Sequence, residues 1–156
     1  MSKFPILRIV LIGAVLAVAG GLYAMTREHL ALDREVSAFV EDSVRAISAR
    51  WDTAELLRRA TPQFSAAAKE AELRAEFNDA EARLGPLVEY RAIGGKTALL
   101  WLPDHPVNAN YIVRAAFAKG EADIEIHAVR TGSTWRIDSF TFGGSPEMRR
   151  LLGIPG

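Results

Sequence analysis

A long uncharged run of apolar residues is the first feature in the pattern along the chain. Residues 9–25 carry no charged side chain, and the apolar character extends back to residue 4 with one interruption. A helix of roughly 20 residues crosses the hydrocarbon core of a bilayer, and Tyr23 lies where an interfacial aromatic ring is favoured. The pattern predicts a transmembrane helix that contacts the lipid bilayer through residues 4–25.

The charges around this segment indicate its orientation. Lys3 and Arg8 lie before or within its first turns, whereas the charges that follow it are of mixed sign. The positive-inside rule therefore puts the N-terminus in the cytoplasm and the rest of the chain outside. A cleaved signal peptide is the alternative, because the residues around Ala19 are small. Cleavage there would release a soluble exported form, so both interpretations export the domain.

Helical periodicity continues beyond the apolar segment. Over residues 29–50 apolar side chains recur at steps of three and four, and no proline or glycine separates Gly21 from Arg50. The apolar positions are Leu32, Val36, Phe39, Val40, Val44 and Ile47. This amphipathic helix can therefore continue directly from the membrane helix.

Capping residues mark further helices. Asp52 is placed to cap a short helix, with Glu55 placed to return a capping-box bond. Pro62 fits the first position of a helical turn. One further helix is predicted over residues 65–83, where Gly85 and the proline after it end the pattern. Its apolar stripe consists of Leu73, Phe77, Ala80 and Leu84.

From residue 87 the apolar period becomes two, which is typical of strands. Residues 87–102 form either a tight hairpin or one long strand bent at Gly94 and Gly95. Three more strands are predicted over residues 110–118, 121–130 and 135–142, with a loop over 103–106 and a short tail helix over 145–153.

A register follows for two of these strands. If Lys119 and Gly120 form a two-residue loop, Ala118 faces Glu121. Phe117, Ala115, Val113 and Tyr111 then meet Ala122, Ile124, Ile126 and Ala128, while Arg114 meets Glu125 and Ile112 meets His127. The first set of pairs is apolar or aromatic throughout, which supports a hairpin with one apolar face.

The last strand changes its apolar face part-way along. Trp135 and Ile137 are apolar at odd positions, but Phe140 and Phe142 are apolar at even ones. We predict a one-residue bulge near residues 138–139 that returns both sets to one face. The other interpretation is a partner that covers both faces, such as a homodimer through the sheet.

Composition excludes some classes of function. Of the 19 Lys and Arg residues, Lys3 and Arg8 belong to the N-terminal segment, which leaves 17 bases against 19 acids. A mildly acidic domain argues against nucleic-acid binding. The chain has no cysteine, which excludes disulfides, thiol nucleophiles and Cys-ligated zinc.

Candidate chemistry is sparse. His127 is expected near Asp138, but on the polar face of the sheet with Arg114, where a solvated lattice of ion pairs is the simpler interpretation. His29, His105 and His127 lack ligand spacing. We therefore predict no catalytic residue, no metal and no cofactor, and leave open whether the protein is an enzyme.

Aromatic side chains on the apolar face have two interpretations, as core residues or as the lining of a ligand pocket. The candidate ligand-binding residues are Trp51, Tyr111, Phe117 and Trp135. No carboxylate is expected on that face, because Asp123, Glu125 and Asp138 point the other way in the predicted register.

Two segments carry a family resemblance. They are residues 84–87, Leu-Gly-Pro-Leu, where helix passes to sheet, and residues 132–138, Gly-Ser-Thr-Trp-Arg-Ile-Asp, at the last strand. Over about residues 30–144 the chain resembles the nuclear transport factor 2-like (cystatin-like) superfamily, and within it small bacterial envelope proteins with a signal or an anchor. The resemblance implies a cone-shaped α+β fold in which helices pack on a curved antiparallel β-sheet. It implies no activity, because enzymes and non-enzymes share the fold.

These interpretations give an N-terminal anchor over residues 1–27, an α+β domain over 28–144 and a tail over 145–156. We expect a single-pass protein of the bacterial inner (cytoplasmic) membrane with a periplasmic or extracellular domain. Its expected function is non-enzymatic binding or assembly with envelope protein partners. The alternative is a small-molecule-binding protein or enzyme that uses the apolar cavity of the cone.

Overall fold

The computed structural model describes residues 4–98 and 106–143, with side chains described mainly from residue 21 onward. The chain divides into two compact units, Met1–Arg34 and Glu35–Gly156. Among the described residues, no helix is both long enough and apolar enough to cross a membrane. The predicted membrane segment lies largely outside the described side chains. Most of the loop over 103–106 and the tail helix over 145–153 lie outside the described residues.

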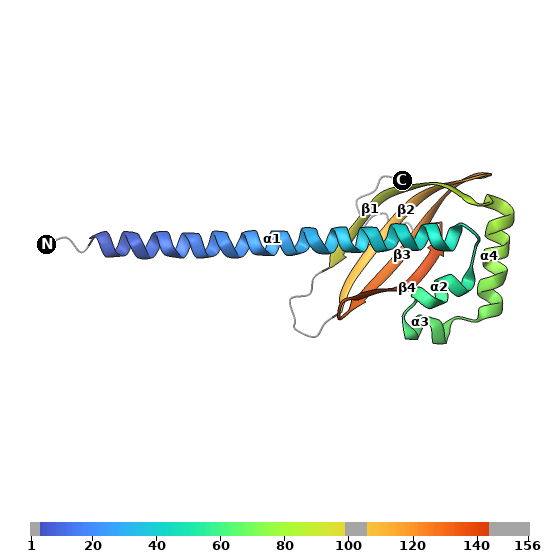
Figure 1. Ribbon diagram of the computed structural model, residues 1–156, viewed down its shortest axis with the longest axis horizontal. Coiled ribbons are helices and arrows are strands. Elements are labelled where there is room, and N and C mark those ends of the chain that lie inside the picture. The colour runs from blue at the N-terminus through green and yellow to red at the C-terminus, as the bar shows by residue number, and fades with distance from the viewer. Residues whose placement is uncertain (1–3, 99–105, 144–156) are drawn as a thin grey trace. The chain divides into compact units, whose positions relative to one another are not determined.

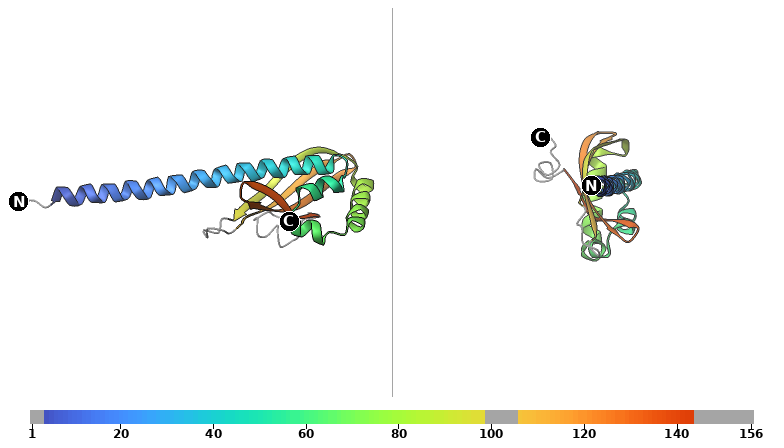
Figure 2. Two further views of the ribbon diagram at one scale, coloured as in Figure 1. Left: turned by 60° about the horizontal axis from the view of Figure 1, so that its bottom comes forward. Right: turned by 90° about the vertical axis from the view of Figure 1, so that its left-hand side faces the viewer.

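The first helix, α1 (Phe4–Ser48), is continuous from the first unit into the second, as the pattern allowed. Within the second unit its apolar face is fully buried at Val36, Val40, Val44 and Ile47. Figures 1 and 2 show this part of α1 crossing one face of the sheet. The predicted amphipathic helix over residues 29–50 is thereby confirmed, and its apolar face is the one that packs on the sheet.

The chain leaves α1 through a Schellman motif. The N–H of Asp52 donates to the carbonyl of Ile47 at 3.1 Å, and Trp51 between them has φ = 53°. This left-handed position is usually glycine, because a Cβ is strained there. A tryptophan at this position indicates that its side chain contributes more than the strain costs.

Three helices follow, α2 (Thr53–Arg59), α3 (Pro62–Ala67) and α4 (Glu70–Leu84). Asp52 caps α2 as predicted, accepting from the N–H groups of Ala54 and Glu55 at 2.9 and 3.3 Å. The predicted capping-box bond is wrong, because the Asp52 N–H is already bonded to α1 and the Glu55 carboxylate binds arginines instead.

The single helix predicted over residues 65–83 is also wrong. Ala68 and Lys69 are extended, with ψ of 123° and 105°, and separate α3 from α4. The break lets α3 contact β4 while α4 contacts α2 and β3. Of the predicted stripe of α4, Phe77 and Ala80 are buried, whereas Leu73 and Leu84 are half-buried.

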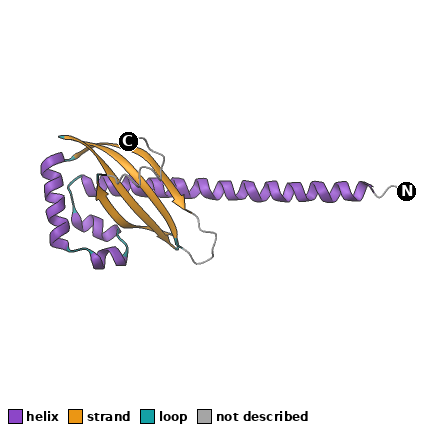
Figure 3. Ribbon diagram, turned by 180° about the vertical axis from the view of Figure 1, so that it is seen from behind, coloured by secondary structure: helices purple, strands orange, loops and turns teal. Residues whose placement is uncertain are grey.

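The sheet has the strands β1 (Leu87–Ala98), β2 (Val107–Phe117), β3 (Gly120–Thr131) and β4 (Thr134–Phe142). They pair antiparallel in the order β1-β2-β3-β4, as Figure 3 shows in orange. β1 is one strand with a register shift between Ala92 and Gly94, so the bent strand is correct and the hairpin is not. Helices on a curved antiparallel sheet confirm the α+β class.

The predicted register of β2 and β3 is wrong by two residues. Phe117 pairs with Gly120 and Val113 with Ile124, so the two-residue loop is Ala118 and Lys119. The amides of these two loop residues donate to the carbonyls of Pro86 and Leu84 at 3.0 and 2.9 Å. A shift of two keeps every side chain on its predicted face, and the contacts with the α4–β1 junction account for the observed loop.

The predicted bulge in β4 is confirmed. His127 pairs with Ser139 and Ala128 with Ile137, which leaves Asp138 as the extra residue. Trp135, Ile137 and Phe140 are consequently all buried. The bulge accounts for the change of face, so Phe140 no longer suggests a homodimer through the sheet.

Candidate functional site

Two of the four candidate ligand-binding aromatics belong to a packed cluster. The Trp51 ring stacks on Phe117 with centroids 5.3 Å apart and contacts Phe77 and Phe142 at 6.0 and 5.3 Å. Its indole N–H donates to the Gly85 carbonyl at 2.9 Å. These rings fill the space between the helices and this end of the sheet, so Trp51 and Phe117 serve as core.

The other two candidates lie elsewhere in the sheet. Phe117 pairs with Gly120 at the start of β3, whereas Trp135 pairs with Arg130 near the end of that strand. Gly120 and Arg130 are ten residues apart along β3, which is roughly 33 Å at about 3.3 Å per residue. Tyr111 lies against Gly95 of β1. All four side chains are buried, but the structure does not bring them together in one site.

A further aromatic residue, Tyr90, places a hydroxyl between α1 and the sheet. The Arg45 guanidinium lies 5.5 Å from the centroid of its ring. The hydroxyl is buried and has no hydrogen-bond partner among the described residues. Burial, with smaller contributions from Glu41 and Tyr111, raises the pKa of the Tyr90 phenol to about 12, while Arg45 opposes the shift.

This shifted pKa predicts a loss of stability in alkali. The folded protein keeps a proton that the unfolded chain, with a tyrosine pKa of about 10, releases. The contribution of Tyr90 to the free energy of unfolding therefore has its full value below pH about 10. It decreases as the pH rises from about 10 to about 12. Urea unfolding across this range should show a shallower decline for Tyr90→Phe than for the wild type. Equal slopes would contradict the prediction.

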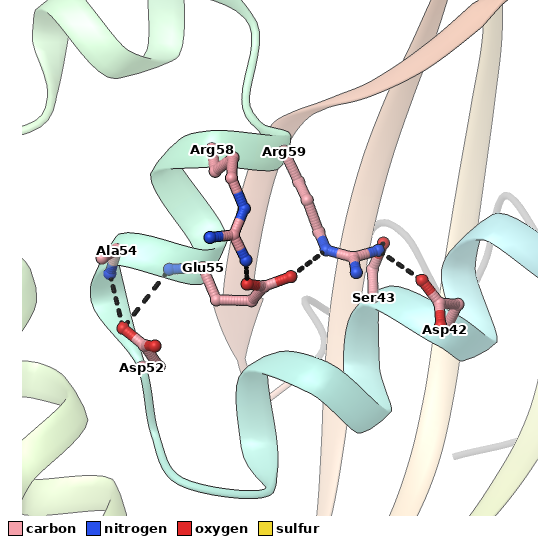
Figure 4. Close-up of polar contacts among 7 residues, drawn as sticks. All are labelled: Asp42, Ser43, Asp52, Ala54, Glu55, Arg58 and Arg59. Atoms are coloured by element: carbon pink, nitrogen blue, oxygen red, sulfur yellow. Dashed lines mark hydrogen bonds and ion pairs between the residues drawn. The ribbon is translucent and has the colours of Figure 1, made fainter.

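Charged side chains join α1 to α2 in the cluster shown in Figure 4. The Nε of Arg59 donates to Glu55 at 2.6 Å, and its Nη1 donates to Asp42 and Ser43 at 2.6 and 3.2 Å. Arg58 also contacts Glu55. Three acceptors on two helices make Arg59 a link between them rather than a solvent-facing residue.

The two arginines should differ in their effect on stability. The Arg59 side chain is 23% exposed and the Arg58 side chain 71%. We expect Arg59→Ala to lower the free energy of unfolding by about 1–2 kcal/mol, because it removes a charged partner of the buried Glu55 and the bond from α2 to Asp42. Arg58→Ala, the matched control, should cost less than about 0.5 kcal/mol. Urea unfolding that gave equal losses would refute the link.

The outer face of the sheet, opposite the helices, is less open to solvent than predicted. Arg114 pairs with Asp123 across the strands, where Glu125 was predicted, and binds it through two hydrogen bonds of 2.9 and 3.2 Å. Ile112 and Asp123 are both buried. This face therefore contains buried positions, so the prediction of a fully solvated lattice of ion pairs is wrong for this part of the sheet.

The predicted pair of His127 and Asp138 exists, with Nδ1 and Oδ2 3.3 Å apart. The hydroxyl of Thr61 donates to the other oxygen of Asp138 at 2.8 Å and accepts from the N–H of Phe64 at 3.1 Å. The bulged Asp138 thus joins β3 and β4 to the cap of α3. Its oxygens are engaged in holding elements together, which supports the structural interpretation of the pair.

An open depression lies between α4 and the adjoining parts of β3 and β4. It comprises two adjacent hollows of about 440 and 290 Å³ that share Arg83 and Phe142. We call it the α4 groove. Its lining consists of Glu76, Asp79, Ala80, Arg83, Leu84, Glu121, Ala122, Asp123, Thr141, Phe142 and Gly143. None of the four candidate ligand-binding aromatics lines it.

Two buried donors lie opposite each other near the end of β3. The Nε of Arg130 and the indole N–H of Trp135 have no hydrogen-bond partner among the described residues. Trp135 is one of the predicted ligand-binding residues. Sequence gave no sign of Arg130, because a single arginine late in a strand is usually solvent-facing.

The comparisons identify no relative. No known protein family, no curated protein and no solved structure matches the chain. Over the described residues, no group of three or more His, Cys, Asp or Glu side chains is arranged to hold a metal ion.

Proposed function

We propose that this protein is a membrane-tethered, extracytoplasmic domain that binds or assembles with other proteins of the bacterial envelope. The observation that carries the proposal is the α4 groove, an open surface feature with Phe142 in its lining and charged side chains around it. Partly exposed aromatic rings bordered by polar groups are typical of protein interfaces.

The tether rests on the sequence. The apolar stretch over residues 4–25 has about the 20 residues that a transmembrane helix needs, and Lys3 and Arg8 favour an N-terminus in the cytoplasm. Confinement to a membrane surface raises the effective concentration of the domain for partners on the same surface. A weak contact between the α4 groove and a partner on the same membrane is therefore enough for binding.

The proposed family is the nuclear transport factor 2-like superfamily. Support for it comes from the helices on one face of a bent antiparallel sheet and from the last strand with its bulge. The packed cluster around Trp51 fills one end of the space between helices and sheet, which favours the binding function over an apolar cavity at that end.

Cell fractionation tests the tether. The full chain should stay in the membrane pellet after alkaline carbonate extraction, with its original N-terminus, and the domain should be open to protease added outside the inner membrane. A soluble chain whose N-terminus lies just after Ala19 would instead support the cleaved signal peptide.

Site-specific photocrosslinking in cells tests the groove. A photoreactive amino acid at Arg83, within the groove, should give a crosslinked band to a second protein. The same amino acid at Ser133, in the exposed turn at the other end of the β3–β4 pair, is the matched control and should not. Recovery of the chain only as a monomer, without groove-specific bands, would refute the binding function.

A further inference from the structure

The two unpartnered donors lie directly opposite each other in the sheet. Arg130 of β3 pairs with Trp135 of β4. Arg130 reaches Glu35 of α1, which places both side chains on the face of the sheet that α1 covers, because directly paired residues share a face. Trp135 is only 5% exposed. Its indole N–H and the Arg130 Nε–H are buried without an acceptor among the described residues.

The chemistry of these groups excludes mutual satisfaction. Indole and guanidinium N–H groups donate but cannot accept, so neither residue can serve the other. A buried donor without an acceptor is costly, and such groups in proteins commonly face a bound water, ion or ligand. Trp51 shows the ordinary arrangement, because its indole N–H donates to the Gly85 carbonyl at 2.9 Å.

The charge of Arg130 is also incompletely paired. Its Nη2 lies 3.3 Å from an oxygen of Glu35, whose side chain is 41% exposed. A strong bond between a guanidinium and a carboxylate is usually about 2.7–2.9 Å long and often uses two N–H groups. Here the Nε–H takes no part. A second carboxylate could bind Nε while Glu35 turns toward solvent.

We propose that Arg130 and Trp135 bind the carboxylate of a small monocarboxylic acid, with one oxygen accepting from the Arg130 Nε–H and the other from the Trp135 indole N–H. A charged oxygen pair supplies two acceptors at once and balances the guanidinium charge. The neighbouring positions on the same face are Ala109, Ala128 and Ile137, which are apolar and fully buried, so the acid that carries this carboxylate must be small. This site is separate from the α4 groove and does not depend on the tether.

Nuclear magnetic resonance of the full chain, labelled with ¹⁵N in maltoside micelles, tests the site. Sodium butyrate is the probe, and butyramide, which has nearly the same shape without the charge, is its control. We expect butyrate to move the Trp135 indole signal downfield in a saturable manner, while the Trp51 indole, already bonded, stays in place. The variants Trp135→Phe and Trp51→Phe assign the two signals.

A variant of the guanidinium completes the test. Arg130→Met should weaken butyrate binding about tenfold, because one charge-assisted hydrogen bond is lost. Arg91→Met, at an arginine of β1 that is 54% exposed, should leave binding unchanged. If Arg130→Met fails to fold by circular dichroism, Arg130→Lys, which keeps the charge without the Nε–H, should show a similar loss. No saturable shift, an equal shift with butyramide, or unchanged binding in the folded Arg130 variant would overturn the proposal.

Discussion

Trp51→Ala is expected to lower the free energy of unfolding by about 4 kcal/mol, within the range for a large aromatic side chain removed from a core. The Trp51 ring packs against Phe77, Phe117 and Phe142, so its removal leaves a cavity bounded by other rings. The substitution also leaves the buried Gly85 carbonyl without the indole donor. Urea unfolding of the full chain in micelles, followed by far-ultraviolet circular dichroism, measures the loss.

Trp51→Gly separates the backbone from the side chain. Because φ at this position is 53°, glycine avoids the strain that alanine retains, and we expect it to be about 1 kcal/mol more stable than Trp51→Ala. This order reverses the usual one, in which glycine is the worse replacement. If alanine proved the more stable of the two, the left-handed position at the end of α1 would be wrong.

Gly95→Ala should have the second largest effect, a loss of about 2 kcal/mol. A Cβ added at Gly95 would overlap the ring of Tyr111. The ring is buried, so it cannot swing into solvent, and either β1 or β2 must move. The expected result is a lower midpoint in urea with little change in the steepness of the transition.

Two comparisons control this prediction. Gly120→Ala adds a Cβ that meets nothing within 4 Å and should change stability by no more than about 0.5 kcal/mol. Tyr111→Leu combined with Gly95→Ala should cost less than the sum of the two single changes, because the smaller side chain removes the overlap. Additive losses would mean that the Tyr111 ring is not the obstacle.

The periodic features of the fold could be predicted from the sequence because burial on one face imposes a fixed spacing. The apolar face of α1 and the faces of β2 and β3 follow from periods of about 3.6 and 2. The bulge at Asp138 was predictable for the same reason, since one extra residue is the simplest way to bring odd and even apolar positions of β4 to one face. His127 was placed near Asp138 by the same alternation.

The features that failed depend on contacts between distant residues. Nothing at Ala68 and Lys69 marks a helix end, and the break arises because α3 and α4 pack on different elements. The loop at Ala118 and Lys119 is stabilised by hydrogen bonds to carbonyls more than thirty residues earlier in the chain. The turn preferences of the loop residues alone do not include these bonds. That the Arg130 Nε–H has no acceptor among the described residues follows only from the positions of the atoms around it, which the sequence does not contain.

The two hairpin turns of the sheet differ in a way that matters for protein engineering. Two-residue turns are usually the preferred places to insert an affinity tag or a fluorophore. The turn at Ala118 and Lys119 donates both amides to the α4–β1 junction, so an insertion there would detach the sheet from α4. The turn at Gly132 and Ser133 is exposed, and a Cβ at Gly132 would meet nothing within 4 Å. Reporter sequences should therefore be tolerated after Gly132 and should unfold the domain after Ala118.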